Sequence, residues 1–271
     1  MWDVKDAMIR TVPYRVRMAG SGPPLLLLHG FSLSGEIFSY LASSLGAQYR
    51  LIAPDLLGHG ETGSPIRLAR YGTGEQVADL VELLSSLEAS PAFVAGYSMG
   101  GRIALSLAMM APWTVRKLVI ESGSPGLSDP GERQTRRASD ERLAERLESA
   151  GVVAFAEDWE RLPLFASQRR ADERERHLQA QIRRRQHAFG LANSLRAIGT
   201  GSQPSWWGWL HELDVPTLLV TGACDVKFTA IAESMRELLP DARHVVVAEA
   251  GHAVHLEQPS DFLQCVTSFL T

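Results

Sequence analysis

Three short apolar runs set the strongest limit on how this chain can fold. They are apolar at every position and cover Leu25–Leu28, Leu51–Ala53 and Ala92–Ala95. A strand with this composition is buried on both faces of a sheet. Apolar residues at helical spacing, over 77–84 and 100–110, separate or follow these runs. Strands that alternate with helices predict an α/β fold: a mostly parallel, twisted sheet with helices on both faces.

The same pattern predicts elements elsewhere in the chain. They are a half-exposed strand over 12–18, buried strands over 117–121, 217–221 and 244–247, and a last helix over 259–269. Thr73 and Gln76 have the spacing of a capping box, which predicts that Thr73 caps the helix that follows.

The alternation stops after residue 123 and resumes at residue 217. Residues 124–209 contain no convincing strand, and their helical stretches carry 14 Arg against 12 Asp and Glu. We therefore expect one sheet domain, formed by residues 1–123 and 210–271. It is interrupted by a helical cap over residues 124–209.

Composition argues against several classes of protein. The 271 residues carry a formal net charge of −4, so we do not expect nucleic-acid binding. The two cysteines, Cys224 and Cys265, form no zinc motif or disulfide framework, and Cys224 is predicted to be a packed thiol. No apolar run is long enough to span a bilayer, and the N-terminus does not resemble a secretory signal. We expect a cytoplasmic protein that does not insert into membranes.

The pentapeptide Gly96-Tyr97-Ser98-Met99-Gly100 has the pattern G-x-S-x-G. It lies directly after a predicted buried strand and directly before a predicted helix, which is the context that this motif requires. The sharp turn forces Ser98 into a strained conformation, and the flanking glycines leave room for it. We expect the Ser98 hydroxyl above the carboxyl edge of the sheet, near the N-terminus of the helix.

A serine hydroxyl needs a neighbouring base to react at neutral pH. His252 and Asp225 each follow a predicted strand, so both are expected at the same edge of the sheet as Ser98. Asp225 would fix the tautomer of the His252 imidazole. His255 is the alternative base and Asp55 the alternative acid. We interpret the sequence around His255 as structural and that around Asp55 as a loop-shaping motif.

His29-Gly30-Phe31 ends the first apolar run. At this position the backbone N–H of Phe31 can pair with that of Met99 to form an oxyanion hole. A lone His-Gly pair is weak evidence for such a site. The pair is a strong signal here because it follows an early buried strand and precedes the G-x-S-x-G motif by about 70 residues.

Together these residues resemble the α/β-hydrolase superfamily over essentially the whole chain, including its Ser, Asp, His order. Other segments resemble a narrower family, the 2-succinyl-6-hydroxy-2,4-cyclohexadiene-1-carboxylate (SHCHC) synthases of menaquinone biosynthesis. These segments are 96–102, 121–127, 132–133, 136–137 with residue 140, 155–159, 164–165, 199–205 and 222–228. The superfamily motifs are common, whereas the motifs within the predicted cap are much more specific.

The resemblance implies a lyase rather than a hydrolase. In this family a proton α to a succinyl ketone is removed, and pyruvate leaves from an enolpyruvyl ether. Ser98, activated by His252 and Asp225, would act as the base, and the amides of Phe31 and Met99 would stabilise the enolate oxygen. The resemblance implies no cofactor, and no ligand cluster for a metal is expected.

The implied substrate is a small molecule with three carboxylates, which gives meaning to individual arginines. Arg102 lies one helical turn after Ser98 and is expected near the floor of the pocket. Arg136 is the implied cap arginine that reaches the substrate. Arg133 and Arg137 are alternatives, and a solvated helix face would explain all three.

Two aromatic residues complete the predicted site. Trp159 would supply a flat apolar wall and Tyr97 a hydroxyl donor, although either residue could serve only in packing. The alternative function is a serine esterase or carbon–carbon bond hydrolase that uses the same triad with water. A neutral ester would not need Arg102 or Arg136. We expect a monomer or a weak homo-oligomer.

Overall fold

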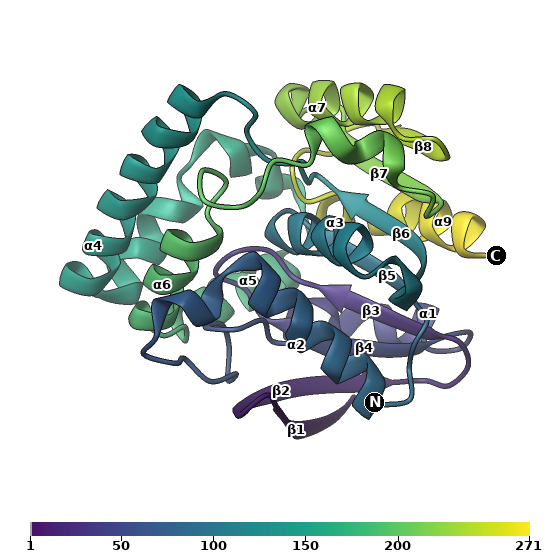
Figure 1. The fold of residues 1–271 in the computed structure, drawn as a ribbon, viewed down its shortest axis with the longest axis horizontal. Helices are drawn as coiled ribbons and strands as arrows, with labels where there is room; N and C mark the ends of the chain where they lie inside the picture. The colour runs from purple at the N-terminus through teal and green to yellow at the C-terminus, as the bar shows by residue number, and fades with distance from the viewer. Residues whose placement is uncertain (1) are drawn as a thin grey trace.

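The computed structural model describes residues 2–271 as an eight-stranded sheet with helices on both faces (Figure 1). The strands lie in the order β1-β2-β4-β3-β5-β6-β7-β8. Strand β2 is antiparallel to β1 and β4, and all other pairs are parallel. The predicted α/β fold is therefore confirmed. The bounds are β1 Asp3–Ile9, β2 Val12–Ala19, β3 Pro24–Leu28, β4 Arg50–Pro54, β5 Ala92–Tyr97, β6 Val115–Glu121, β7 Thr217–Gly222 and β8 Ala242–Val247.

Strand β5 occupies the centre of the sheet, between β3 and β6, and all of its residues are buried. Its register pairs Gly96 with Leu28 of β3 and with Ile120 of β6. The carboxyl ends of these three strands therefore meet at one edge. In open α/β sheets this is the edge at which ligands bind.

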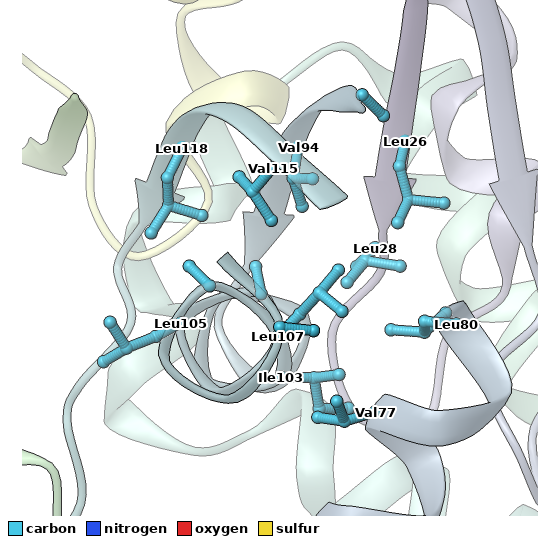
Figure 2. Packing of buried hydrophobic residues seen from close by; sticks show 14 of the residues in the cluster. Leu26, Leu28, Val77, Leu80, Val94, Ile103, Leu105, Leu107, Val115 and Leu118 are labelled. Atoms are coloured by element: carbon cyan, nitrogen blue, oxygen red, sulfur yellow. The ribbon is translucent and has the colours of Figure 1, made fainter. Parts of the chain in front are cut away.

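Two hydrophobic clusters cover the two faces of the sheet. Leu26 and Leu28 of β3 belong to the cluster that includes helices α2 (Thr73–Ser86) and α3 (Met99–Met110). Figure 2 shows this packing of α3 against the strands and α2. Leu25 and Leu27 belong to the other cluster, under α9 (Pro259–Leu270). Successive leucines thus fill opposite faces, which explains why the run is apolar at every position.

The remaining helical elements connect the strands at their ends. They are η1 Gly35–Leu41, α1 Ala42–Leu45, η2 Leu68–Tyr71, η3 Pro112–Thr114, η5 Trp207–Glu212, α7 Val226–Leu238 and α8 Val254–Glu257, where η marks a 3₁₀ helix. Helix α7 joins β7 to β8 and packs through Ala232 and Met235 into the cluster that holds α3.

A helical insertion separates β6 from β7. It contains α4 (Pro130–Glu160), η4 (Pro163–Arg170), α5 (Glu173–Arg184) and α6 (Ala188–Ile198), and no strand lies between residues 124 and 209. Helices α4 and α6 pack side by side through their own small apolar cluster, beside the sheet (Figure 1). Helix α4 bends at Gly151, whose φ is +82°.

Two local features differ from the sequence pattern. Strand β1 is not predicted, because only Ile9 is buried and the strand shows no apolar alternation. It turns into β2 through Arg10 and Thr11, both at positive φ, without the Asn or Gly that usually marks such a turn. The predicted capping box is wrong. Helix α2 begins after Gly72, and the buried Gln76 side chain donates instead to the Tyr71 carbonyl at 3.0 Å.

Within residues 2–271, no helix combines the length and the apolar composition needed to cross a bilayer. The expected cytoplasmic location, the absence of a cofactor and the monomeric or weakly oligomeric state stay predictions.

Candidate active site

Ser98 lies on a sharp turn between β5 and α3, at φ +52° and ψ −107°. Glycine is required on both sides of it. A Cβ atom on Gly96 would lie 2.3 Å from the Gly100 carbonyl oxygen, and one on Gly100 would lie 2.0 Å from the Leu28 oxygen. The backbone N–H of Ser98 donates to the Glu121 carbonyl at 2.8 Å. This φ is rare for serine, so the surrounding backbone holds Ser98 in a strained conformation.

His252 links Ser98 to Asp225. Its Nε2 lies 2.9 Å from the Ser98 Oγ, and its Nδ1 lies 2.7 Å from the Asp225 Oδ2. A proton on Nδ1 donates to the carboxylate and leaves Nε2 free to accept the serine proton. Only 1% of His252 is exposed, so bulk water does not compete for these bonds. The structure brings the three predicted triad residues together in hydrogen-bonding order.

Asp225 is held in place because it also begins helix α7. Its Oδ1 accepts from the backbone N–H of Phe228 at 3.3 Å, which leaves Oδ2 for His252. The prediction of a packed thiol at Cys224 is wrong, since this side chain is exposed. Cys224 precedes α7 in a turn, where its amide donates to Ala250 and its side chain faces outward.

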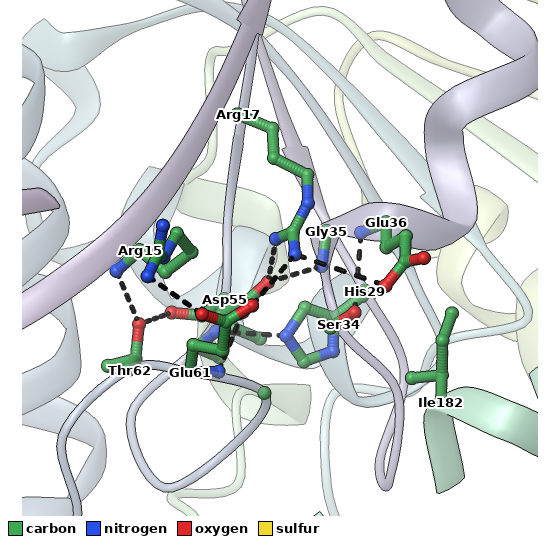
Figure 3. Close-up of polar contacts among 12 residues, drawn as sticks. Arg15, Arg17, His29, Ser34, Gly35, Glu36, Asp55, Glu61, Thr62 and Ile182 are labelled. Carbon is green, nitrogen blue, oxygen red and sulfur yellow. Dashed lines mark hydrogen bonds and ion pairs between the residues drawn. The ribbon is translucent and has the colours of Figure 1, made fainter. Parts of the chain in front are cut away.

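The alternative base and acid have other partners. The His255 Nδ1 lies 2.8 Å from the Glu121 Oε1, and the pair is buried. Asp55 accepts from Arg17 at 2.5 Å and from the Gly35 amide at 2.8 Å (Figure 3). Burial is the main influence on the Asp55 carboxyl and raises its pKa, although Arg17 opposes this shift. These contacts fit the interpretation that Asp55 shapes its loop.

The two predicted oxyanion-hole amides flank the cavity above Ser98. Phe31 follows β3, and Met99 is the first residue of α3, whose N–H has no partner within the helix. Among the described residues, neither amide donates to a backbone acceptor. His29 anchors the Phe31 loop, because its Nε2 accepts from the Leu56 amide at 2.9 Å. Burial lowers the pKa of His29 to about 3, so this imidazole is neutral.

A cavity of about 420 Å³ lies over Ser98 and His252. Its lining includes every predicted site residue except Asp225, which lies behind His252: Phe31, Tyr97, Ser98, Met99, Arg102, Arg136, Trp159 and His252. The volume is within the usual range for small-molecule sites.

Arg102 contributes to the cavity a guanidinium group that uses only part of its hydrogen-bonding capacity. One of its terminal nitrogens donates to the Ile198 carbonyl at 2.7 Å and to the Gln203 side chain. Within residues 2–271 its other nitrogens have no acceptor, and no carboxylate forms an ion pair with it. Burial and, to a smaller extent, nearby Arg136 lower the pKa of Arg102 to about 10, while Asp140 opposes the shift. The side chain remains a cation at neutral pH.

Of the three cap arginines, Arg136 lines the cavity. Its Nε donates to the Asp140 Oδ1 at 2.8 Å. Arg133 and Arg137 instead donate to the carbonyls of Leu127 and Gly201, at 3.3 and 3.1 Å, and do not line the cavity.

Tyr97 and Trp159 both line the cavity, and both also pack. The Tyr97 ring lies between two histidines, with its centroid 5.5 Å from that of His252 and 4.6 Å from that of His255. Burial raises the pKa of Tyr97, so its hydroxyl stays protonated and can donate. Trp159 packs edge-on against Phe31, at 5.4 Å between centroids, and joins the insertion to the loop that follows β3.

Two further cations, which the sequence analysis did not select, also line the cavity: Arg183 and Lys227. Arg183 is 5% exposed, and its guanidinium lies over the Phe165 ring at 5.8 Å. Burial lowers its pKa. The sequence signal that could have identified Arg183 is helical spacing, since Gln179, Ile182 and Arg183 share one buried face of α5. Lys227 is one of only three lysines in the chain.

The lining therefore carries four cationic side chains, Arg102, Arg136, Arg183 and Lys227, and no Asp or Glu among the described residues. Ser98, which is hydrogen-bonded to His252, lines the same space as Phe31 and Met99, the residues of the two predicted oxyanion-hole amides. Such an arrangement can remove a proton, stabilise an oxyanion, and bind a ligand with several negative charges.

Comparisons with known proteins agree with this geometry. The chain matches a family described as the alpha/beta hydrolase fold over residues 23–259. It is 44% identical, over 95% of both chains, to a Bacillus subtilis (strain 168) protein provisionally named as an SHCHC synthase. It is 32% identical to the SHCHC synthase of Klebsiella pneumoniae (strain 342), over 92% of this chain and 94% of the other. The structure of MenH from S. aureus superposes with a TM-score of 0.90 at 33% identity, covering 95% of this chain and 97% of that one.

Proposed function

This chain belongs to the SHCHC synthase family of α/β-hydrolases, and from that premise we propose its reaction. It eliminates pyruvate from 2-succinyl-5-enolpyruvyl-6-hydroxy-3-cyclohexene-1-carboxylate. The other product is SHCHC, an intermediate of menaquinone biosynthesis. The reaction makes the chain a carbon–oxygen lyase that requires no water.

The charge of the cavity carries this proposal. Four cations and no carboxylate line the space over Ser98. Partly buried guanidinium groups are costly unless an anion pairs with them, so a cavity with this lining favours a polyanionic ligand. The proposed substrate has three carboxylates to offer. Arg136 and Arg183 have internal carboxylate partners, Asp140 and Glu160, at 2.8 and 3.6 Å, whereas a neutral ester would leave Arg102 and Lys227 without one.

The triad supplies the base for the proposed elimination. The Ser98 Oγ takes the proton α to the succinyl ketone while its own proton passes to the His252 Nε2, 2.9 Å away. The electron pair of the broken C–H bond moves to the ketone oxygen, where the Phe31 and Met99 amides stabilise it. It then returns to form a double bond between ring carbons 2 and 3. The existing double bond between carbons 3 and 4 moves to carbons 4 and 5, and the bond from carbon 5 to the enolpyruvyl oxygen breaks. His252 returns its proton to the departing enolate, which leaves as pyruvate.

We propose that residues 124–209 act as a cap over a catalytic domain formed by residues 1–123 and 210–271. Arg136, Trp159 and Arg183 reach the cavity from this insertion, whereas Ser98 and His252 lie at the sheet edge. The edge-on contact between Trp159 and Phe31 closes the space between the two parts. Exclusion of water would favour elimination over hydrolysis by the same triad.

The experiment that tests the function is pyruvate release by the purified protein from the enolpyruvyl substrate. A lactate-dehydrogenase-coupled assay follows the pyruvate, and a neutral aryl ester is offered in parallel. We expect rapid pyruvate release and slow ester hydrolysis. Fast ester hydrolysis without pyruvate release would contradict the proposal and favour the serine-hydrolase alternative.

A further inference from the structure

Glu121, the last residue of β6, contacts both sides of the triad. Its main-chain carbonyl accepts from the Ser98 amide at 2.8 Å. Its side-chain carboxylate accepts from the His255 amide at 2.9 Å and from the His255 Nδ1 at 2.8 and 2.9 Å. One residue thus holds the turn that carries the nucleophile and the loop that carries the base.

The loop at 250–255 has few other side-chain attachments. Glu257 accepts from the amides of Gly251 and Ala253, at 2.8 and 3.2 Å, and fixes the backbone immediately around His252 from within the same segment. Tyr40 donates to the His255 carbonyl at 2.5 Å. Glu121 differs from both, because it is the one that also belongs to the strand beside the nucleophile turn.

Neither Glu121 nor His255 lines the cavity over Ser98. Both are buried, at 2% and 1% exposure, and the Tyr97 ring lies between His255 and His252. Their pairing can therefore affect the reaction only through the position of other groups. A buried hydrogen-bonded pair of this kind fixes geometry, because each polar group must keep its partner in the low-dielectric interior.

We infer that Glu121 is a positioning residue that sets the distance between the Ser98 hydroxyl and the His252 imidazole. The inference rests on the proposed triad, although not on the identity of the substrate. Loss of the carboxylate would let the 250–255 loop shift relative to the Ser98 turn. A displacement of about 1 Å between reacting groups can lower a rate by about 100-fold.

The test compares Glu121→Gln and Glu121→Leu with the wild type. Glutamine keeps an oxygen for the His255 amide, whereas leucine keeps no acceptor. We expect kcat for pyruvate release to fall about 10-fold in the glutamine variant and about 100-fold in the leucine variant. KM should change less than about twofold, because no cavity contact is altered. A rise in KM as large as the fall in kcat, or an unchanged kcat in both variants, would overturn the inference.

A second readout separates this inference from the proposed reaction. The rate at which a small fluorophosphonate modifies Ser98 measures activation of the hydroxyl by His252 without any natural substrate. We expect it to fall in the same order as kcat. If the protein releases no pyruvate but the Glu121 variants still lose this reactivity, the proposed reaction fails and the positioning role stands. Unchanged reactivity would contradict the positioning role.

Asp79→Asn is the matched control for lost stability. Asp79 is fully buried and accepts from Tyr14 at 2.6 Å and from Arg70 at 2.5 and 2.7 Å, and none of the three lines the cavity. The Asp79→Asn substitution should lower the unfolding temperature, whereas kcat should stay at the wild-type value. If Glu121→Leu does not fold, His255→Asn removes the same imidazole contact and should lower kcat with KM retained.

Discussion

Arg136 donates from its Nε to Asp140, one turn later in α4, at 2.8 Å. This bond orients the guanidinium and leaves its two terminal nitrogens without an acceptor among the described residues. Asp140 also opposes the fall in the Arg102 pKa that burial causes. Two guanidiniums at the cavity thus share one internal carboxylate. A carboxylate on the ligand would supply the second negative charge.

Removal of either guanidinium should weaken the use of a polycarboxylate substrate. A charge-assisted hydrogen bond in a partly dry cavity is worth about 1.5–3 kcal/mol. We therefore expect Arg102→Ala and Arg136→Ala each to lower kcat/KM for pyruvate release by roughly 10- to 150-fold. Arg102→Lys should recover only part of the loss, because an ammonium group cannot form a paired contact. Steady-state kinetics on the purified variants measures this.

Arg133→Ala and Arg137→Ala are matched controls for those variants, since both lie in α4 but outside the cavity. They should retain near-wild-type kcat/KM. Hydrolysis of a small neutral ester should not change in Arg102→Ala or Arg136→Ala. Equal losses on both substrates would mean that these arginines support the fold rather than the ligand.

The triad should behave as a unit. Ser98→Ala or His252→Ala should lower kcat by at least about 10³-fold, because neither residue can transfer the proton alone. Asp225→Asn should cost less if the imidazole keeps its orientation. Single-turnover assays of pyruvate release would measure the losses. A His252→Ala variant with near-normal activity, beside an inactive His255→Ala, would show that the base is misassigned.

Gly100 should tolerate no side chain. An alanine Cβ there would lie 2.0 Å from the Leu28 oxygen and 2.7 Å from the His29 oxygen, so strand β3 or helix α3 must move. We expect Gly100→Ala to lower the free energy of unfolding by more than about 2 kcal/mol, as measured by urea denaturation. Gly208→Ala is the control, because no atom lies within 4 Å of its added Cβ. Equal stability of the two variants would contradict the steric argument.

Acid should destabilise the fold through buried histidines. Burial and, to a smaller extent, neighbouring His29 lower the pKa of His59 to about 3. Between pH 6.5 and 3 the unfolded chain therefore binds a proton at this residue that the folded chain does not. The associated stability is present above pH 6.5 and is lost as the pH falls toward 3.

His59→Gln should reduce this acid sensitivity. Between pH 7 and pH 5 its free energy of unfolding should fall by roughly 2 kcal/mol less than that of the wild type. Urea denaturation at the two pH values measures the difference. His211→Gln is the control, since 66% of that side chain is exposed. An identical pH dependence for His59→Gln and the wild type would show that the pKa of His59 does not differ between the folded and unfolded chains.

The central strands and the triad were predictable because each depends on a local pattern. Leu25–Leu28 fills two faces at once, and Ser98 sits in a motif whose glycines have no sterically possible substitute. The tertiary pairing of Glu121 with His255 was not predictable, because 134 residues separate them and no spacing rule links them. Arg183 was missed for a related reason. Its neighbours Arg184 and Arg185 are solvated, and only the three-dimensional fold distinguishes it from them.

The scarcity of lysine affects how the protein can be handled. Lys227 is exposed and lines the cavity, whereas Lys5 lies on β1 and Lys117 donates to the Phe269 carbonyl at 2.7 Å. Amine-reactive resins and dyes therefore have few side chains to attach to, and one of them lies at the cavity. Coupling through Lys227 would place the resin or dye at the cavity in part of the molecules. Attachment through a terminal tag would not use this lysine.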